Sequence, residues 1–313
     1  MGDGMKRGPK ITLVIVLILG IFGALGYVAK YRYEERIKTL FGIEKQEKIE
    51  IATPVAITKV KKGTVRETIV LNGEIVAKRE VNIFSTVPGK IKKIYVEEGE
   101  RVKKGKVLAY IDRSEAGVKF APAPVEATID GIIKKVLVEV GAYITPQLPL
   151  FQIIQIDEVE VVVNIPEKEI YRVKPGIFAE VKLVSYPGKV FRGRLSELSP
   201  VVDPVSRTQE GKIRLDNSSG LLKPGMFGEV TLIIKTERNV PVIPISALTR
   251  RDDKQVIFKV EDSRAVVVNP EFGIAEGEKI SIRKGVKVGD SVIVIGQQNV
   301  ADGDRVNVVE EIQ

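Results

Sequence analysis

Two stretches of the chain repeat one another, and this repeat constrains the fold more than any other feature. GKIKKIYVEEGERV at residues 89–102 matches GIIKKVLVEVGAYI at residues 131–144 at a constant offset. The identical pairs are Gly89 and Gly131, Ile91 and Ile133, Lys92 and Lys134, Lys93 and Lys135, Val96 and Val138, Glu97 and Glu139, and Gly99 and Gly141. Each copy predicts a strand, a turn at glycine and a second strand. Neither copy can bury its apolar face alone, so the two are expected to pack together as a small β-sandwich.

The rest of the chain beyond residue 49 also has the pattern of short strands. Runs rich in Val and Ile alternate with polar residues and are separated by Gly, Pro, Asn and Asp. Hydrophobic residues make up 44% of the chain and charged residues 29%, a composition typical of folded domains. With 313 residues, the sequence predicts an elongated, mainly β chain of several domains.

The composition argues against most chemistry. The chain has no Cys and no His, so the commonest metal ligands and general bases are missing. Its methionines are Met1, Met5 and Met226, too dispersed for a copper or silver site. The net charge of +8 comes from Lys interleaved with Glu along predicted strands, which indicates a solvated surface rather than a nucleic-acid groove. We expect no enzyme activity, no metal and no cofactor.

An uncharged segment near the N-terminus predicts a membrane anchor. Residues 11–29 read ITLVIVLILGIFGALGYVA, long enough to cross a bilayer once as a helix. A cleaved signal peptide is the alternative, but the apolar run is longer than usual and no small-residue cleavage site precedes Lys30. We therefore expect residues 1–10 in the cytoplasm, a single span at 11–29 and a helical stalk at 30–48.

The repeat and its surroundings resemble a known family. VPGKIKKIYVEEGERVKKGKVLAYID, followed by ATIDGIIKKVLVEVGAYI, is similar to the split lipoyl domain of the membrane fusion proteins, the HlyD-like periplasmic adaptors of efflux pumps. The PEKEI, YPG, SRT and LKPGMF elements then follow in the order of that family's β-barrel domain. VPVIPISAL and GVKVGDSVIVIGQQNVADGDRV resemble its membrane-proximal domain.

The resemblance implies a division into three β-domains. The membrane-proximal β-domain would take residues 49–65 and 239–313, the β-barrel residues 66–80 and 157–238, and the lipoyl-like β-sandwich residues 81–156. Within the barrel, the motif residues to examine are Pro187, Gly188, Arg207 and Thr208. For Arg207 the sequence favours an ion pair with a nearby carboxylate over a functional contact. The sequences Lys174-Pro175-Gly176 and Lys223-Pro224-Gly225 predict type II turns at hairpin tips.

The chain departs from the family inside the lipoyl-like domain. Most relatives carry a long α-helical hairpin there, but residues 113–125 read RSEAGVKFAPAPV, which is too short and too rich in Pro and Gly for two helices. We expect a short loop, with Arg113, Lys119 and Phe120 as candidate partner contacts. A lipoyl or biotinyl carrier with a modified Lys119 is a remote alternative, since its neighbours match neither carrier pattern.

The family resemblance implies a transport adaptor held at the outer face of the cytoplasmic membrane. Its partners would be an inner-membrane transporter and other copies of itself, in a ring of three to six, with an outer-membrane channel reached without a coiled-coil hairpin. YPGKVFRGRLSELSP and VSRT look more like adaptors of resistance-nodulation-division (RND) pumps than of ABC exporters. Gln147, between two prolines, favours the ABC class, whose similar adaptors carry a pore-gating glutamine in this region; a solvent-exposed loop amide is its simpler interpretation. The sequence does not indicate the substrate.

Overall fold

The computed structural model describes residues 23–33, 36, 52–114 and 120–312. Residues 23–33 are helical, and the part from residue 52 onward is almost entirely strand and turn. Of the helical residues that the structure describes, none belongs to a helix with the length and hydropathy needed to cross a bilayer. The expected span at 11–29 and stalk at 30–48 lie mostly outside the described residues, as does Lys119.

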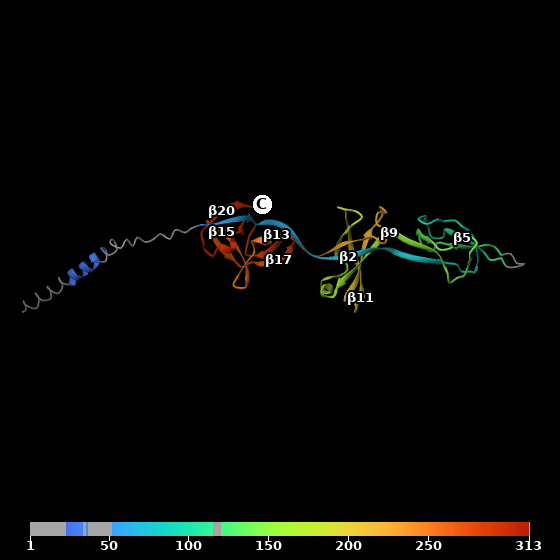
Figure 1. Cartoon of the computed structure of the whole chain (residues 1–313), viewed down its shortest axis with the longest axis horizontal. Helices are drawn as coiled ribbons and strands as arrows, with labels where there is room; N and C mark the ends of the chain where they lie inside the picture. Colours follow the sequence, from blue (N-terminus) through green and yellow to red (C-terminus); the bar gives the residue numbers. More distant parts are fainter. Residues whose placement is uncertain (1–22, 34–35, 37–51, 115–119, 313) are drawn as a thin grey trace, which may run out of the picture.

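The β-rich part of the chain is elongated and consists of three bodies in a row (Figure 1). We call them the C-terminal domain, the central barrel and the repeat module, in that order along the long axis. Each has its own buried apolar cluster. The prediction of an elongated, mainly β chain is confirmed.

The C-terminal domain joins the two ends of the described β region. Its main sheet has the order β14-β15-β19-β1-β20, in which β1 (Thr53–Lys59) lies antiparallel to β19 (Ser291–Ile295) and parallel to β20 (Val306–Glu311). The remaining elements are η2 (Ile245–Ala247), β14 (Thr249–Arg251), β15 (Lys254–Glu261), β16 (Arg264–Val268), β17 (Glu271–Glu276), β18 (Lys279–Lys284) and η3 (Gln297–Asn299). The domain therefore closes only when residues near both ends of the sequence meet.

The central barrel is an antiparallel sheet curled around one core. Its strands include β10 (Phe178–Leu183), β11 (Val190–Asp203) and β12 (Thr208–Asp216), and η1 (Glu167–Arg172) precedes β10. The core consists almost entirely of Val, Leu and Ile side chains, most of them fully buried. Burial of this apolar surface is the main force holding the barrel together.

The repeat module is built by exchange of strands between the two copies. The first copy gives β3 (Gly89–Ile94) and β4 (Arg101–Val102), and the second gives β7 (Gly131–Val136) and β8 (Tyr143–Ile144). β4 pairs with β7 and β8 pairs with β3, so each short strand completes the other copy's sheet. β5 (Val107–Asp112) and β6 (Ala123–Glu126) extend the first sheet, and β9 extends the second.

Hydrogen bonds in the module obey the same two-fold relation. Gly99 donates its N–H to the carbonyl of Ile133, and Gly141 donates to that of Ile91, both at 2.8 Å. The reciprocal bonds, from the N–H of Ile133 and of Ile91 to the opposite turn, are both 2.9 Å long. The sandwich of two mutually dependent copies that the repeat predicts is therefore present.

Three long strands run from one body into the next without a linker. β2 (Lys61–Phe84) passes through all three, while β13 (Phe227–Pro244) joins barrel to C-terminal domain and β9 (Pro149–Pro166) joins barrel to repeat module. β2 pairs with β13 over its first half and with β9 over its second. The bodies are thus connected by paired ribbons (Figure 1).

Two local predictions need correction. The Lys-Pro-Gly turns are present, with positive φ at Gly176 and Gly225, but neither is a hairpin tip. Gly176 follows η1 instead of a strand, and Gly225 precedes β13, which pairs with β10 and β2 rather than with β12. The short loop expected at residues 113–125 ends earlier, because β6 begins at Ala123, and residues 115–119 lie outside the described residues.

Candidate functional site

The glycines of the repeat have two different structural roles. An added Cβ would lie 2.4 Å from the carbonyl oxygen of Asp112 at Gly89, and 2.4 Å from that of Ile154 at Gly131. Gly99 and Gly141 instead have φ of +88° and +89° in open turns. The first pair permits close approach of strands and the second pair permits the turn, so these predicted residues shape the module rather than contact a ligand.

The outer end of the module carries the loop between β5 and β6. The Arg113 guanidinium donates to the carbonyl of Ala121 at 2.9 Å and lies 5.6 Å from the centre of the Phe120 ring. Phe120 itself is exposed. The structure thus brings together Arg113 and Phe120, two of the three residues expected there.

Gln147 lies in the turn between β8 and β9. The N–H of Leu148 bonds the carbonyl of Thr145, and the Gln147 side chain is exposed. Leu148, Phe84 and Tyr143 nearby are also exposed, each by 45% or more. In this structure Gln147 is therefore an exposed loop amide.

The YPG motif forms the turn between β10 and β11. Gly188 has φ of +77°, and the preceding Tyr186 donates its hydroxyl to the carbonyl of Leu221 at 3.0 Å. The Tyr186 ring packs edge-on against Phe191. Tyr186 therefore anchors this end of the barrel sheet, and Gly188 allows the turn.

The expected ion pair of Arg207 is not present among the described residues. Arg207 has φ of 52° in the turn between β11 and β12 and bonds the Asp203 carbonyl through its own N–H. The Asp203 carboxylate accepts from the N–H groups of Ser206 and Val205 and from the Ser206 hydroxyl, which lowers its pKa. The carboxylate therefore caps the turn instead of binding the guanidinium.

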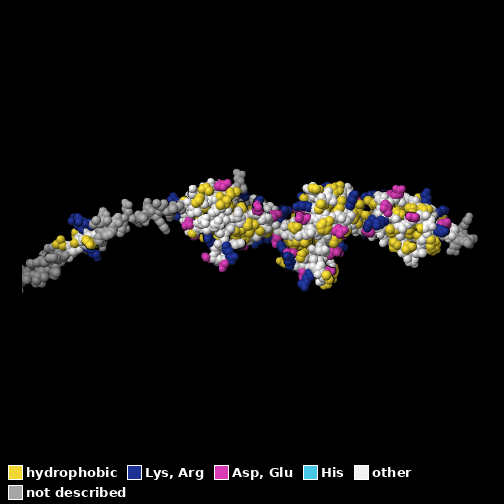
Figure 2. All heavy atoms as spheres, viewed as in Figure 1, with side chains coloured by type: hydrophobic (Ala, Val, Ile, Leu, Met, Phe, Trp, Pro, Cys, Tyr) yellow, Lys and Arg dark blue, Asp and Glu magenta, His cyan; other side chains and the backbone are white. Residues whose placement is uncertain are grey.

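This turn presents an apolar surface that the sequence did not single out. Val201, Val202 and Val205 are exposed by 69%, 40% and 93%, and we call them the barrel tip. The tip projects sideways from the barrel, where hydrophobic and basic atoms meet at the surface (Figures 1 and 2). Thr208 hydrogen-bonds Ser206 at 2.8 Å within the same turn. Val201 and Val202 lie at the end of β11 and Val205 in the turn that follows, so the available signal was three valines close to a turn that contains Asp, Pro and Ser.

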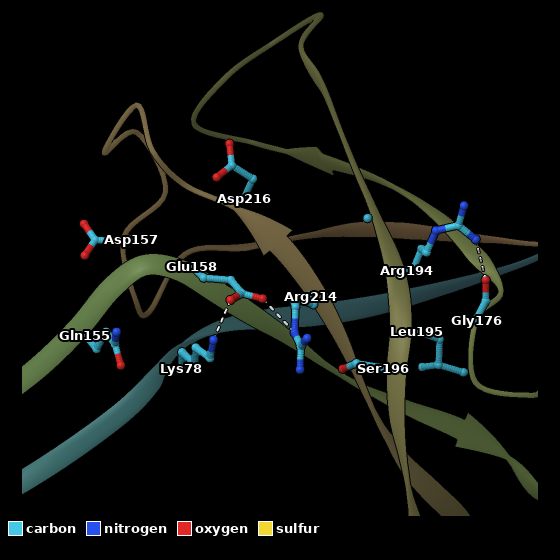
Figure 3. Close-up of a pocket in the computed structure, with 11 residues that line it drawn as sticks. Lys78, Gln155, Asp157, Glu158, Gly176, Arg194, Leu195, Ser196, Arg214 and Asp216 are labelled. Atoms are coloured by element: carbon cyan, nitrogen blue, oxygen red, sulfur yellow. Dashed lines mark hydrogen bonds and ion pairs between the residues drawn. The ribbon is translucent and has the colours of Figure 1, made fainter.

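A cavity of about 830 Å³ opens where the barrel meets the repeat module (Figure 3). Glu158 lies between Lys78 and Arg214 and forms ion pairs of 2.5 and 2.6 Å with them. Across the cavity, Arg194 donates to the carbonyl of Gly176 and its guanidinium stacks on Phe178. Three of the six charged side chains that line the cavity, Lys78, Glu158 and Arg214, thus form ion pairs with one another.

Nothing in this arrangement points to bond-making chemistry. Within residues 23–33, 36, 52–114 and 120–312, no group of three or more acidic side chains could hold a metal ion. Acidic and basic side chains alternate over the visible face of all three bodies (Figure 2). An elongated set of β-domains with exposed docking elements is typical of a binding or adaptor protein.

Comparison with known families shows the class. Residues 79–164 match the barrel-sandwich hybrid domain of RND membrane fusion proteins, residues 158–236 match the CusB-like β-barrel domain, and residues 240–308 match the C-terminal permuted SH3-like domain of YknX. These three segments correspond in order to the repeat module, the central barrel and the C-terminal domain. The chain belongs to the membrane fusion proteins, the periplasmic adaptor subunits of efflux pumps.

Individual relatives agree with this assignment. Multidrug resistance protein MdtA of Escherichia coli is 24% identical over 315 residues, covering 76% of this chain and 75% of the relative. The crystal structure of MacA from Actinobacillus actinomycetemcomitans has a TM-score of 0.60 at 17% identity and covers 75% of this chain and 98% of its own. A MacA–MexA chimera that carries the Pseudomonas aeruginosa MexA α-hairpin domain has a TM-score of 0.54 at 20% identity, covering 74% and 97%. The last two show the fold.

Proposed function

We propose that this protein couples an inner-membrane transporter of the RND class to the path out of the cell, with the barrel tip as one of its contacts to that transporter. The observation that supports the contact is the exposure of Val201 and Val202 at the end of β11 and of Val205 in the following turn, which the Asp203 carboxylate caps. Isolated large apolar side chains are common on surfaces, but three at the end of one projecting hairpin indicate a protein contact.

The proposed layout follows the order of the bodies. Residues 1–10 lie in the cytoplasm, 11–29 cross the membrane and 30–48 form a stalk. The C-terminal domain, at 49–65 and 239–313, lies closest to the membrane, followed by the barrel at 66–80 and 157–238. The lipoyl-like module at 81–156 lies farthest out. Three to six copies form a ring. Any contact with an outer-membrane channel is made by the lipoyl-like module itself, without a coiled-coil hairpin.

The transporter class rests on specific matches. Two of the three matching family models are RND-type domains, which favours an RND pump. An ABC exporter is the second candidate, and the observation that favours it is the exposed Gln147 in the turn before β9. In the ABC case Gln147 would line a gate, and replacing it would change flux.

Cross-linking from the barrel tip tests the contact. The chain has no cysteine, so Val205→Cys introduces a single reactive site in the full-length membrane protein. We expect a short thiol-reactive photocross-linker at this position to capture a multi-span transporter, identified by mass spectrometry as RND or ABC. Lys223→Cys, in an exposed turn elsewhere on the barrel, is the matched control.

A substitution adds a functional readout. Val205→Asp places a charge at the contact and is expected to abolish complementation of efflux while leaving membrane level and thermal unfolding unchanged. Full efflux by Val205→Asp together with equal cross-linking from both cysteines would refute the barrel tip as a transporter contact. Capture of an ABC permease would instead replace the RND assignment.

A further inference from the structure

The two junctions between the bodies are built in opposite ways. At the inner junction, between C-terminal domain and barrel, β2 pairs with β13. At the outer junction, between barrel and repeat module, β2 pairs with β9. Both are two-stranded ribbons, so what packs against each ribbon decides its stiffness, because an isolated two-stranded ribbon is only marginally stable.

The inner junction has a small core of its own. Val65 of β2, Val242 of β13 and Ile274 of β17 are buried against one another, with Val240 partly buried beside them. At Gly63, an added Cβ would lie 2.8 Å from the Val242 side chain. The ribbon is therefore tightly packed against the C-terminal domain at this point.

An arginine ties the same ribbon to both neighbouring bodies. Arg66 donates from Nε and from its backbone N–H to the two carboxylate oxygens of Glu276, each at 2.9 Å, and from a terminal nitrogen to Glu180 at 3.4 Å. Glu276 belongs to β17 of the C-terminal domain and Glu180 to β10 of the barrel. Paired, partly buried contacts of this kind bind more strongly than exposed ones.

The outer junction has no buried cluster of its own, and the structure describes all of its residues. Ile156 is only partly buried there, against the barrel core. No side chain is buried on β2 between Ile75 and Ile83, or on β9 between Ile153 and Val159. The inner ladder has two bulges of one extra residue each, at Ile234 and Asn239 of β13, whereas the outer ladder has a larger irregularity. There, Ala77 pairs with Val159 while Arg79 pairs with Gln155. Three residues of β9 thus lie opposite one residue of β2, a bulge that bends and loosens a ribbon.

Two ion pairs reach from the module to this ribbon. Lys134 of β7 donates to both carboxylate oxygens of Glu80, at 2.7 and 2.9 Å, with side chains 39% and 43% exposed. Arg101 forms an ion pair of 2.8 Å with Asp157, and both side chains are more than half exposed. Exposed pairs of this kind contribute little to stability. On the barrel side, Asn217 holds the carbonyls of Ile156 and Asp157, so the unsupported part lies between these residues and the module. The cavity beside it leaves room for movement.

We propose that the chain bends at the outer junction only, so that the C-terminal domain and the barrel move as one body while the repeat module swings about residues 77–80 and 154–155. Arg66 keeps the inner junction closed. The swing directs the outward end of the adaptor without disturbing the face held by the transporter.

Distances between paired spin labels test this proposal in the full-length protein in detergent. The cysteine-free chain allows Lys174→Cys on the barrel to be paired with Lys103→Cys on the module or with Lys254→Cys on the C-terminal domain. All three side chains are exposed. We expect the barrel–module distribution to be about twofold wider than the barrel–C-terminal one.

Arg66→Ala is expected to broaden the barrel–C-terminal distribution about twofold and to leave the barrel–module one unchanged. Arg192→Ala, which removes only an exposed guanidinium 3.9 Å from Glu180, is the matched control. If Arg66→Ala fails to fold, Glu276→Gln tests the same link. Equal widths at the two junctions, or no broadening by both Arg66→Ala and Glu276→Gln, would overturn the proposal.

Discussion

At Gly131 and Gly89 a single missing carbon atom allows two strands to approach. The site of an added Cβ lies 2.4 Å from a neighbouring carbonyl oxygen at each position, a distance that Cβ atoms do not adopt. At Gly141 the space is open, but φ is +89°. Substitution at these positions therefore separates the effect of crowding from that of backbone strain.

We expect Gly131→Ala to destabilise the repeat module by about 1–3 kcal/mol through crowding. Gly141→Ala should cost about 1–2 kcal/mol through left-handed strain alone. Hydrogen exchange of the β3 and β7 amides measures both in the intact protein, where a single global unfolding energy is not defined. Unchanged exchange in Gly131→Ala would contradict the crowding seen at this position.

Glu237 is the most strongly perturbed carboxylate at the inner junction. A hydrogen bond of 2.7 Å from the Ser281 hydroxyl, with further help from Arg283 and Lys235, lowers its pKa from 4.5 to about 2, against the opposing effect of its burial. Its side chain is only 13% exposed, so solvent screens these contacts little.

Because the folded-state pKa of Glu237 is depressed, its stabilising contribution is complete above pH 4.5 and is lost as the pH falls from 4.5 towards 2. The contribution is at most about 3 kcal/mol. We expect the unfolding temperature of the C-terminal domain to fall as the pH is lowered through this range. The fall should be smaller in the Glu237→Gln variant. An identical pH profile for the variant would refute this role.

Some residue roles could be predicted from sequence and others could not. The repeated glycines stood out because the same spacing occurs twice, and their geometry explains why. The predicted ion pair of Arg207 was wrong. A carboxylate close to an arginine in sequence suggests an ion pair, but the N–H groups of the turn bind the Asp203 oxygens instead. The sequence did not single out Val205, because this side chain is exposed only as a result of the β11–β12 hairpin projecting from the barrel.

At the scale of elements, the exchange of β4 and β8 makes the two copies of the repeat depend on one another. Ile91 and Ile133 are fully buried in one shared core and occupy equivalent positions. The repeat predicted a sandwich, but sequence alone does not say which copy supplies which strand to which sheet. In the same way, it could not show that Gly176 and Gly225 lie outside hairpins, because pairing is set by the barrel as a whole.

We expect Ile133→Ala to cost about 2–5 kcal/mol and to reduce hydrogen-exchange protection in β3 as much as in β7, although only β7 carries the substitution. The strands of the barrel serve as the internal control and should keep their protection. Loss of protection confined to β7 would show that the copies fold independently.

On the scale of the whole molecule, the membrane anchor is the expectation that lies mostly outside the described residues. If residues 11–29 span the membrane, the intact chain should resist extraction by high salt and by alkaline carbonate and dissolve only in detergent. Removal of residues 1–29 should give a water-soluble protein that keeps the β-domains. Release of the intact chain by salt would refute the anchor.

The long shared strands also determine the order in which the three bodies can fold. Apart from its part of β2, the repeat module is built from strands between residues 89 and 153. The C-terminal domain, in contrast, must pair β1 (Thr53–Lys59) with β20 (Val306–Glu311). Contacts so distant in sequence form slowly and require nearly the whole chain. A polypeptide that emerges N-terminus first would therefore complete its outermost body first and the body nearest its starting point last, leaving the edges of β1 and β2 unpaired in the meantime. Such edges are targets for misassembly until the last strands of the C-terminal domain have been made.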